Sequence, residues 1–183
     1  KVSPENREAI TECLKKGIKV IITTGKTIYS VSNIIDQLNL VDPQIVSGGA
    51  AIIDSNKNIL FKLNIPLDLG NEVVLLCRKY KQGLALSAED GLLYYEKDHP
   101  GIDFIAETGD KTVKVDDLIK DNITSKALVF TVPIEAKDEF NQVMEKEFAH
   151  KLKLRRGGPV FLNVVNKNAG KAFALNKILE QFG

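Results

Sequence analysis

The sequence predicts an α/β fold, in which a parallel-sheet core carries an inserted α+β domain. The segment before residue 50 runs helix, strand, helix, strand, an order typical of a parallel sheet. Hairpins and helices mix from residue 50 onward, and a final strand and helix return to the first pattern. At 183 residues the chain is long enough for one or two domains with a buried core.

The segment before residue 50 supplies the α/β unit. Ser3 and Pro4 are typical of a helix N-terminus, and Gly17 is typical of its end. The run from Ile18 to Ile22 is almost continuously apolar, which suits a buried parallel strand. We expect a second helix over about 28–38 and a second strand over 44–46.

The rest of the chain is expected to combine hairpins with helices. Asp90-Gly91 is a strong hairpin turn signal, and a polar segment at 55–58 separates two other short strands. The expected strands are 51–54, 59–63, 84–87, 92–96, 127–132, 151–155 and 160–165. The expected helices are one that buries Val73, Val74, Leu76, Cys77 and Tyr80, one over about 134–149 and one over about 171–182.

The composition is that of an ordinary globular protein, with 44% hydrophobic and 27% charged residues. The net charge of +1 does not indicate a basic surface for binding nucleic acid or an anionic membrane. No apolar run is long enough to span a bilayer and no signal peptide opens the sequence, so we expect a cytoplasmic protein. Cys13 and Cys77 lie among apolar neighbours, which favours buried reduced thiols over a disulfide.

The polar turn Thr24-Gly25-Lys26 follows the first expected strand at its C-terminal end. Ligands bind at that edge of open α/β sheets, and a hydroxyl, free backbone amides and a helix N-terminus together form a phosphate cradle. The alternative interpretation is structural: Thr24 caps the helix and Gly25 permits the turn. We do not expect a P-loop nucleotide hydrolase, because the P-loop motif needs a glycine at the position of Val20.

A second polar turn, Asn168-Ala169-Gly170-Lys171, opens the final helix. A lysine there can neutralise a phosphoryl group, although lysines at helix starts are usually only solvated. His99 and His150 have no carboxylate or cysteine at metal-ligand spacing and are expected at the surface. The basic run 150–156 is interpreted as the solvent face of a strand, and the acidic pairs 89–90 and 116–117 as a turn and a helix start.

Taken in order, these segments resemble the Cof-type phosphatases of the haloacid dehalogenase-like superfamily. The stretch from Gly17 to Lys26 is similar to that family's hydrophobic strand followed by Thr-Gly-Arg. The stretch Ser47-Gly48-Gly49-Ala50 resembles its Asn-Gly-Ala segment, and Val164 to Lys171 resembles its third motif. The resemblance covers essentially the whole chain.

The resemblance implies a Rossmann-like core, incomplete in this chain, over 1–61 and 160–183, with a cap domain inserted at 62–159. It implies magnesium-dependent hydrolysis of a small phosphorylated metabolite, most often a sugar phosphate, through an aspartyl-phosphate. Thr24 would hydrogen-bond the transferring phosphoryl oxygen, and Lys171 would hold the charges of nucleophile and phosphate together. The residues implied to bind phosphate or substrate are Gly25, Lys26, Gly48 and Gly49, and the cap would select the leaving group.

The sequence departs from the family pattern at the acidic positions. The resemblance places the catalytic aspartates before Ser3 and the acidic loop for Mg²⁺ after the last helix, so we expect no metal ligand and no activity from these 183 residues alone. Lys26 and Gly48 stand where arginine and asparagine are usual. The alternative hypothesis is an inactive fragment of the same fold that binds a ligand or partner, whose open sheet edge predicts a homodimer.

Overall fold

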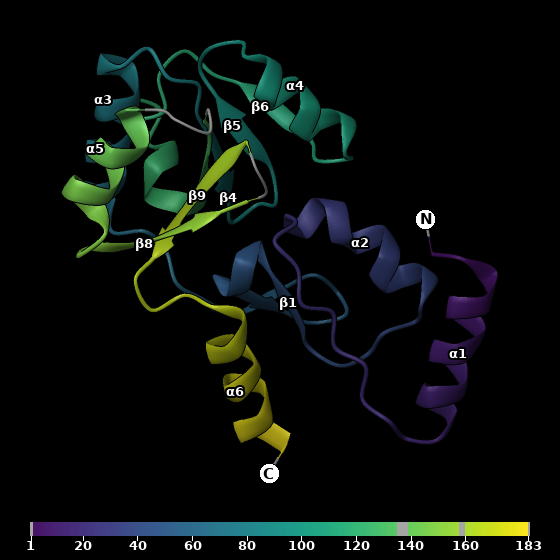
Figure 1. Cartoon of the computed structure of the whole chain (residues 1–183). Helices are drawn as coiled ribbons and strands as arrows, with labels where there is room; N and C mark the ends of the chain where they lie inside the picture. The colour runs from purple at the N-terminus through teal and green to yellow at the C-terminus, as the bar shows by residue number, and fades with distance from the viewer. Residues whose placement is uncertain (1, 135–138, 158–159, 183) are drawn as a thin grey trace.

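The structure, a computed structural model, describes residues 2–134, 139–157 and 160–182. It has the predicted α/β architecture, with two sheets of unequal size (Figure 1). A three-stranded sheet lies near α1 (Pro4–Lys15), α2 (Ile28–Gln37) and α6 (Lys171–Phe182) in the lower part of the view. A six-stranded sheet with its own helices forms the upper part.

The three-stranded sheet is built from β1 (Gln44–Val46), β2 (Ala51–Ile53) and β3 (Ile59–Lys62), all antiparallel. The helices beside it begin at the caps that the sequence predicts. Ser3 Oγ accepts a hydrogen bond from the Asn6 N–H at 3.3 Å, and Thr27 Oγ1 accepts one from the Ser30 N–H at 3.2 Å. The predicted helices over 4–17 and 28–38 and the hairpin around 55–58 are confirmed.

The strand predicted over 18–22 is wrong, although its parallel contact with β1 is present. One parallel bridge joins Thr23 to Ile45, and the Ile45 N–H donates to Ile22 O at 2.9 Å. The next hydrogen bond of this segment goes to a side chain and not to the backbone of β1, because Gln44 Oε1 accepts the Ile22 N–H at 2.6 Å. Among the described residues no strand pairs with the other edge of this segment, and Ile18 is 51% exposed. The run is therefore paired on one edge only and is less buried than a central strand would be.

The six-stranded sheet has the order β6-β5-β4-β7-β9-β8, in which only β5 and β6 are parallel neighbours. Its strands are β4 (Ala85–Ala88), β5 (Leu93–Tyr95), β6 (Thr112–Lys114), β7 (Ala127–Pro133), β8 (Leu152–Arg156) and β9 (Phe161–Asn166). The connecting helices are α3 (Leu67–Lys79), α4 (Pro100–Glu107) and α5 (Glu139–Phe148), and the 3₁₀ turns η1 (Ser47–Gly49) and η2 (Ile123–Lys126) complete the chain. The helix predicted from 134 is described from Glu139, since 135–138 lie outside the described residues.

Two elements of this part, α4 and β6, were not predicted from the sequence. His99 caps α4, because its Nδ1 accepts a hydrogen bond from the Gly101 N–H at 3.0 Å, and Pro100 occupies the first turn. His99 is therefore half-buried and not at the surface as predicted, whereas His150 is exposed. Asp116-Asp117 begins no helix, and the Asp117 carboxylate accepts the backbone N–H groups of the turn that follows.

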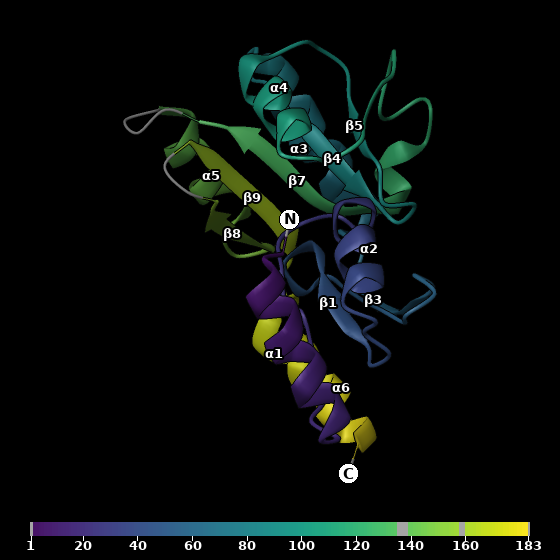
Figure 2. The same cartoon turned by 90° about the vertical axis from the view of Figure 1, so that its right-hand side faces the viewer.

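Each face of the larger sheet has its own packing. One face is covered by α3 and α5, which with the strands bury Val73, Cys77, Leu86, Phe130, Met144 and Val164 among others (Figures 1 and 2). The other face carries α4 over part of its area, through Ile102 and Ile105. Since β9 pairs with β7 and β8, strand pairing favours a domain boundary after Asn166. The predicted division at 160 stays a prediction.

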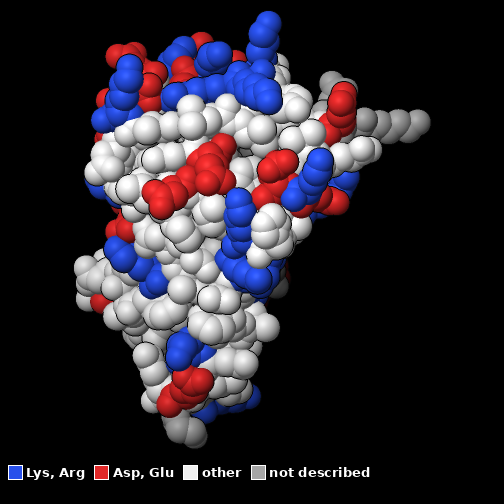
Figure 3. Space-filling model, turned by 90° about the vertical axis from the view of Figure 1, so that its left-hand side faces the viewer, with Lys and Arg blue, Asp and Glu red and all other residues white. Residues whose placement is uncertain are grey.

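The outer surface carries charges of both signs. On the face shown in Figure 3, Lys and Arg side chains gather at the top, and Asp and Glu side chains lie among and below them. Within the described residues no helix is both long enough and apolar enough to cross a bilayer. Cys77 is buried, and burial raises the pKa of its thiol to about 12, while Cys13 is half-buried; both are free thiols, as predicted.

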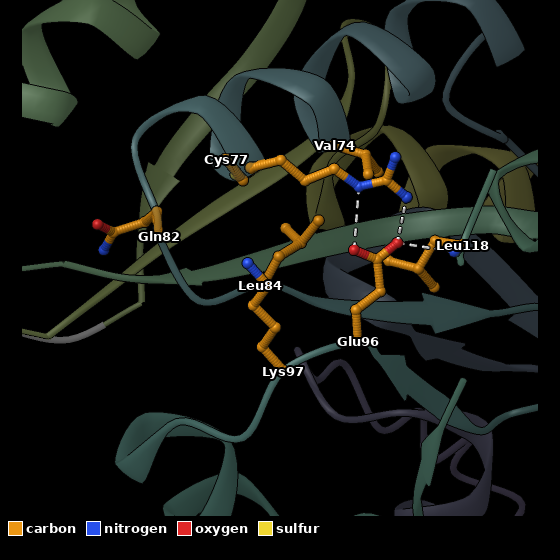
Figure 4. Close-up of a pocket in the computed structure, with 8 residues that line it drawn as sticks. Val74, Cys77, Gln82, Leu84, Glu96, Lys97 and Leu118 are labelled. Atoms are coloured by element: carbon orange, nitrogen blue, oxygen red, sulfur yellow. Dashed lines mark hydrogen bonds and ion pairs between the residues drawn. The ribbon is translucent and has the colours of Figure 1, made fainter. Parts of the chain in front are cut away.

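An ion-pair cluster ties α3 to the edge of the larger sheet (Figure 4). The Arg78 guanidinium donates to both carboxylate oxygens of Glu96, at 3.0 and 2.5 Å, and to Asp117 at 2.7 Å. Glu96 also accepts the Leu118 N–H at 2.7 Å. The cluster therefore joins three segments of the chain, namely α3, the residues after β5 and the turn after β6, through charge-assisted hydrogen bonds.

Replacing Arg78 by methionine should lower the free energy of unfolding by about 1 to 3 kcal/mol, because it leaves two half-buried carboxylates without their cation. Urea unfolding followed by circular dichroism measures the change. The control is Lys120→Met, which removes an exposed cation 4.0 Å from Asp117 and should change stability by less than about 0.5 kcal/mol. Equal effects of the two variants would contradict this view of the cluster.

The same cluster predicts a response to acid. The Lys120 backbone N–H and then the Arg78 guanidinium lower the pKa of Asp117 from 3.8 to about 2. The ionised carboxylate thus stabilises the fold fully above the ordinary pKa, and this stabilisation is lost as the pH falls through about 2. Between these values, acidification should destabilise the parent chain more than Asp117→Asn. Urea midpoints at a series of pH values test this, with Asp116→Asn expected to follow the parent.

Candidate functional site

Three loops that are far apart in the sequence meet between the two sheets. The Gly48 N–H donates to Thr24 O at 2.9 Å, and the Ser47 N–H donates to Lys26 O at 2.9 Å. Gly49 packs directly on the start of α6, since a Cβ atom there would lie only 2.6 Å from the Lys171 nitrogen. The structure therefore brings the predicted site residues Thr24, Gly25, Lys26, Gly48, Gly49 and Lys171 to one end of the three-stranded sheet.

Thr24 does not cap a helix, which was the structural alternative for this residue. Its Oγ1 accepts a hydrogen bond from the Lys26 N–H at 3.1 Å inside the turn, whereas Thr27 caps α2. Because Oγ1 accepts from the backbone, its proton is left to donate outward. Gly25 leaves open space beside it, as a Cβ atom there would meet no atom within 4 Å.

Lys171 lies at the first position of α6, and its side chain is exposed. Gly170 precedes the helix, and its carbonyl accepts the Ala174 N–H at 2.9 Å. Within the described residues the Lys171 ammonium has no hydrogen bond or ion pair. An unpaired cation beside the free N–H groups of a helix N-terminus is a favourable place for an anion.

Lys26 reaches across to the larger sheet, an arrangement that the sequence did not indicate. Its Nζ lies 2.7 Å from Thr108 Oγ1 and 3.2 Å from Asp110 Oδ2. The Asp110 carboxylate is 9% exposed and also accepts the Thr27 hydroxyl at 2.8 Å and the Ser30 hydroxyl. This buried carboxylate thus joins the start of α2 to the loop before β6.

Two cations of β8 hold the other side of the site. Lys153 Nζ donates to Ala169 O at 2.7 Å, and Arg155 donates to Ala169 O at 3.2 Å and to Gly48 O at 3.3 Å. Burial and then the Arg155 charge lower the pKa of Lys153. The prediction that Lys153 and Arg155 lie on the solvent face of this strand is wrong, because both are half-buried against the loops. The alternation with Leu152 and Leu154 was visible in the sequence, but it did not tell which side faced water.

A cavity of about 390 Å³ opens beside Thr24 and Gly25, between the loops and the larger sheet. Its polar lining from that sheet consists of Ser87, Thr131 and Asn163, and its apolar lining includes Leu93, Ile105, Val129 and Phe161. The volume is within the range of small-molecule sites. The geometry can therefore hold an anion at the loops and an attached group against the sheet.

The described residues do not form a magnesium site. No three His, Cys, Asp or Glu side chains among them lie close enough together to hold a metal ion. Asp110, which lines the cavity, is already bound to Lys26, Thr27 and Ser30. Mg²⁺ needs several oxygen ligands at one point, so these residues do not fit the ion.

Replacing Asp110 by asparagine should loosen the contact between α2 and the larger sheet, because the charge that Lys26 meets is removed. We expect roughly 10-fold faster hydrogen exchange at the amides of residues 26–30. Hydrogen-exchange mass spectrometry measures this. The control is Asp103→Asn, an exposed carboxylate on α4 that should leave these amides unchanged. Unchanged exchange in Asp110→Asn would show that the carboxylate does not hold the two parts together.

Comparison with known proteins finds one matching family. A family model for haloacid dehalogenase-like hydrolases matches residues 1–183. The phosphatase YcsE of Bacillus subtilis, named for 5-amino-6-(5-phospho-D-ribitylamino)uracil, is 29% identical over 184 residues, covering 100% of this chain and 65% of that protein.

A haloacid dehalogenase-like hydrolase of Bacteroides thetaiotaomicron has the same fold, with a TM-score of 0.89, 18% identity and coverage of 100% of this chain and 71% of that one. The sugar phosphatase BT4131 matches with a TM-score of 0.78, 20% identity and coverage of 98% and 69%. The chain thus spans 65% of the length of the curated relative YcsE.

Proposed function

Since the chain belongs to the Cof-type haloacid dehalogenase-like hydrolases, we propose that it carries the phosphate-binding part of a phosphomonoester hydrolase. The proposed substrate is a small phosphorylated metabolite. The observation that carries the proposal is the meeting of the Thr24 turn, Gly48-Gly49 and the start of α6 at Lys171. A cavity opens beside the Thr24 turn. The family match favours this proposal over a binding fragment without catalysis.

Thr24 and Lys171 have complementary roles in the proposal. The Thr24 hydroxyl, which accepts from the Lys26 N–H, donates its proton to an oxygen of the phosphoryl group. The Lys171 ammonium and the first N–H groups of α6 meet the negative charge of that group. Donors and cations that are already in place when charge develops account for much of the rate enhancement of phosphoryl transfer.

Gly25, Gly48 and Gly49 serve the site through their backbone. Gly48 and Gly49 have φ values of +67° and +88°, a region that favours glycine, and they let the loop pass close to the start of α6. Lys26 has another role in the structure, because its ammonium is bound to Thr108 and Asp110. We therefore propose that Lys26 acts mainly at the contact between the core and the cap, and only secondarily on the substrate.

A sugar phosphate is the substrate class that we propose. YcsE is named for a substrate with a phosphorylated ribityl chain, and BT4131 is named as a sugar phosphatase. The cavity of about 390 Å³ has room for a leaving group of this size. Magnesium enters the proposal through the family alone, and we infer that the aspartate nucleophile and the metal ligands come from outside the described residues.

The phosphate site can be tested on the 183-residue chain by titration with inorganic phosphate, followed by ¹H–¹⁵N NMR. Shifts are expected at the amides of Gly25, Gly48 and Lys171. Thr24→Val and Lys171→Ala should each weaken binding roughly 10-fold, because each removes a direct donor. The control is Lys177→Ala on the same helix, whose ammonium is 3.2 Å from Glu180 and which should bind like the parent.

The same sample provides a test of catalysis. With Mg²⁺ and sorbitol 6-phosphate we expect no phosphate release, because the described residues supply no carboxylate cluster. Release of phosphate would show that the nucleophile lies within these residues and would contradict this part of the proposal. If phosphate binding is absent, or is the same in all variants, the phosphate site itself is wrong.

A further inference from the structure

We propose that the larger sheet carries a second ligand site, where the first turn of α4 meets the end of β7 and the start of β9. The site fits an uncharged aromatic ring that bears both a hydrogen-bond donor and a hydrogen-bond acceptor. The inference is independent of the proposed function, because it involves none of the loops assigned to phosphate.

A cavity of about 510 Å³ lies at this place, and we call it the second cavity. Pro133 at the end of β7 is directly opposite Phe161 at the start of β9. Gly101 of α4 packs on Pro133, since a Cβ atom there would lie 2.8 Å from the Cβ and Cγ atoms of the proline. The volume of the second cavity is within the range of small-molecule sites.

The stacked rings of Phe104 and Phe161 separate the second cavity from the one beside Thr24. Their centroids are 6.1 Å apart at an interplanar angle of 26°, and both residues line both cavities. None of the residues 24–27 is among the described residues that line the second cavity. A ligand there would therefore contact the wall of the first cavity without reaching the loops, a position suited to an effector.

The lining of the second cavity favours an uncharged, apolar body. Among the described residues that line it there is no Asp, Glu, Lys or Arg. Two of its large apolar side chains are open to water, since Phe104 is 54% exposed and Val160 is 48% exposed. Apolar side chains exposed together beside one concave surface are typical of a binding site. An aromatic ring placed against Phe104 would remove this surface from water.

His99 and Gln82 give the wall a fixed donor and a fixed acceptor. The Gly101 N–H donates to His99 Nδ1 at 3.0 Å, so the ring proton lies on Nε2, which is left to donate. The Gln82 amide NH₂ group donates to Pro133 O, which leaves Oε1 to accept. Figure 4 shows that this amide points away from Glu96 and its ion pair. Neither His99 Nε2 nor Gln82 Oε1 has a hydrogen bond within the described part of the chain.

Gly83 keeps these two polar groups near each other. A Cβ atom at Gly83 would lie 2.7 Å from Cγ and Cδ2 of His99, so the imidazole lies directly against the residue that follows Gln82. A ring with a carbonyl and an N–H group can pair with both, because its carbonyl accepts from His99 Nε2 and its N–H donates to Gln82 Oε1. Loss of either bond would leave a polar group in the cavity without a partner, so the site should prefer a lactam ring to an analogue that lacks the N–H.

The probe for this site is 2-quinolinone, a neutral bicyclic lactam, and 1-methyl-2-quinolinone is the analogue without the N–H donor. Each is titrated into the 183-residue chain and followed by ¹H–¹⁵N NMR. We expect shifts at the amides of Gly83, Gly101 and Phe161 and none at Gly48. The methylated analogue should bind roughly 3- to 10-fold more weakly, because Gln82 Oε1 then has no donor.

Two pairs of variants test the residues. His99→Ser removes the Nε2 donor but keeps a residue that can cap α4, and it should weaken binding of 2-quinolinone roughly 3- to 10-fold. The control is His150→Ser, the same change at an exposed histidine, which should bind like the parent. Phe104→Ser should also weaken binding, whereas Leu179→Ser, at a side chain that is 52% exposed on α6, should not. Thermal unfolding of each variant confirms that it remains folded.

The inference is overturned if the parent does not bind 2-quinolinone, if it binds both quinolinones equally, or if His150→Ser loses as much affinity as His99→Ser. Shifts centred on Gly25 and Gly48 instead of Gly83 and Gly101 would also overturn it. None of these outcomes bears on the phosphate site, which is tested with inorganic phosphate. A chain that binds 2-quinolinone at Gly83 and Gly101 but binds no inorganic phosphate keeps the second site and loses the proposed function.

Discussion

The close contact between Gly49 and the start of α6 is the constraint on which the site depends. A Cβ atom at Gly49 would lie 2.5 Å from the Gly170 oxygen, and the residue has a φ of +88°, so the loop could not pass here with any other side chain. The contact sets the place of Lys171 relative to Gly48, whose N–H in turn fixes the Thr24 carbonyl. One backbone approach therefore positions the groups that would surround a phosphate.

Strand β8 of the larger sheet strengthens this contact from outside the three-stranded sheet. Arg155 and Lys153 bind the carbonyl groups of Gly48 and Ala169, which lie on either side of the Gly49 contact. Both cations are partly buried in this position and lose part of their hydration there. The hydrogen bonds that they donate to the carbonyl oxygens compensate for this loss. A shift of β8 relative to these loops would therefore also move the loops, so the position of the larger sheet and the geometry of the loops are physically coupled.

Local signals in the sequence predicted most of the helices and strands, but interactions between residues far apart in the sequence were not predicted. Caps such as Ser3 and turns such as Asp90-Gly91 act over a few residues, and the structure has them as predicted. The run 18–22 reads as a strand in isolation, but strand formation depends on partners that a single sequence does not name. Asp110 could not be found for a similar reason, because its partners Lys26, Thr27 and Ser30 are some 80 residues away. The turns at Thr24 and Lys171 could be singled out because they have short motifs, and the structure brings them to one end of the three-stranded sheet. Their role in phosphate binding stays a prediction.

The alternation of the larger sheet explains how one element can serve both stability and recognition. Leu86, Phe130 and Val164 point to the core formed with α3 and α5, and their neighbours Ser87, Thr131 and Asn163 point to the cavity. In β8, Leu152 packs in the same core, while Lys153 binds the core loop. Since the period of two keeps these sets on opposite faces, the cavity residues can differ without a change in the apolar core. The phosphate loops, in contrast, are fixed by backbone contacts that tolerate no substitution at Gly49. The residues that line the cavity on the sheet can therefore vary without disturbing the apolar core, whereas the loop at Gly49 cannot vary without disturbing its contact with α6.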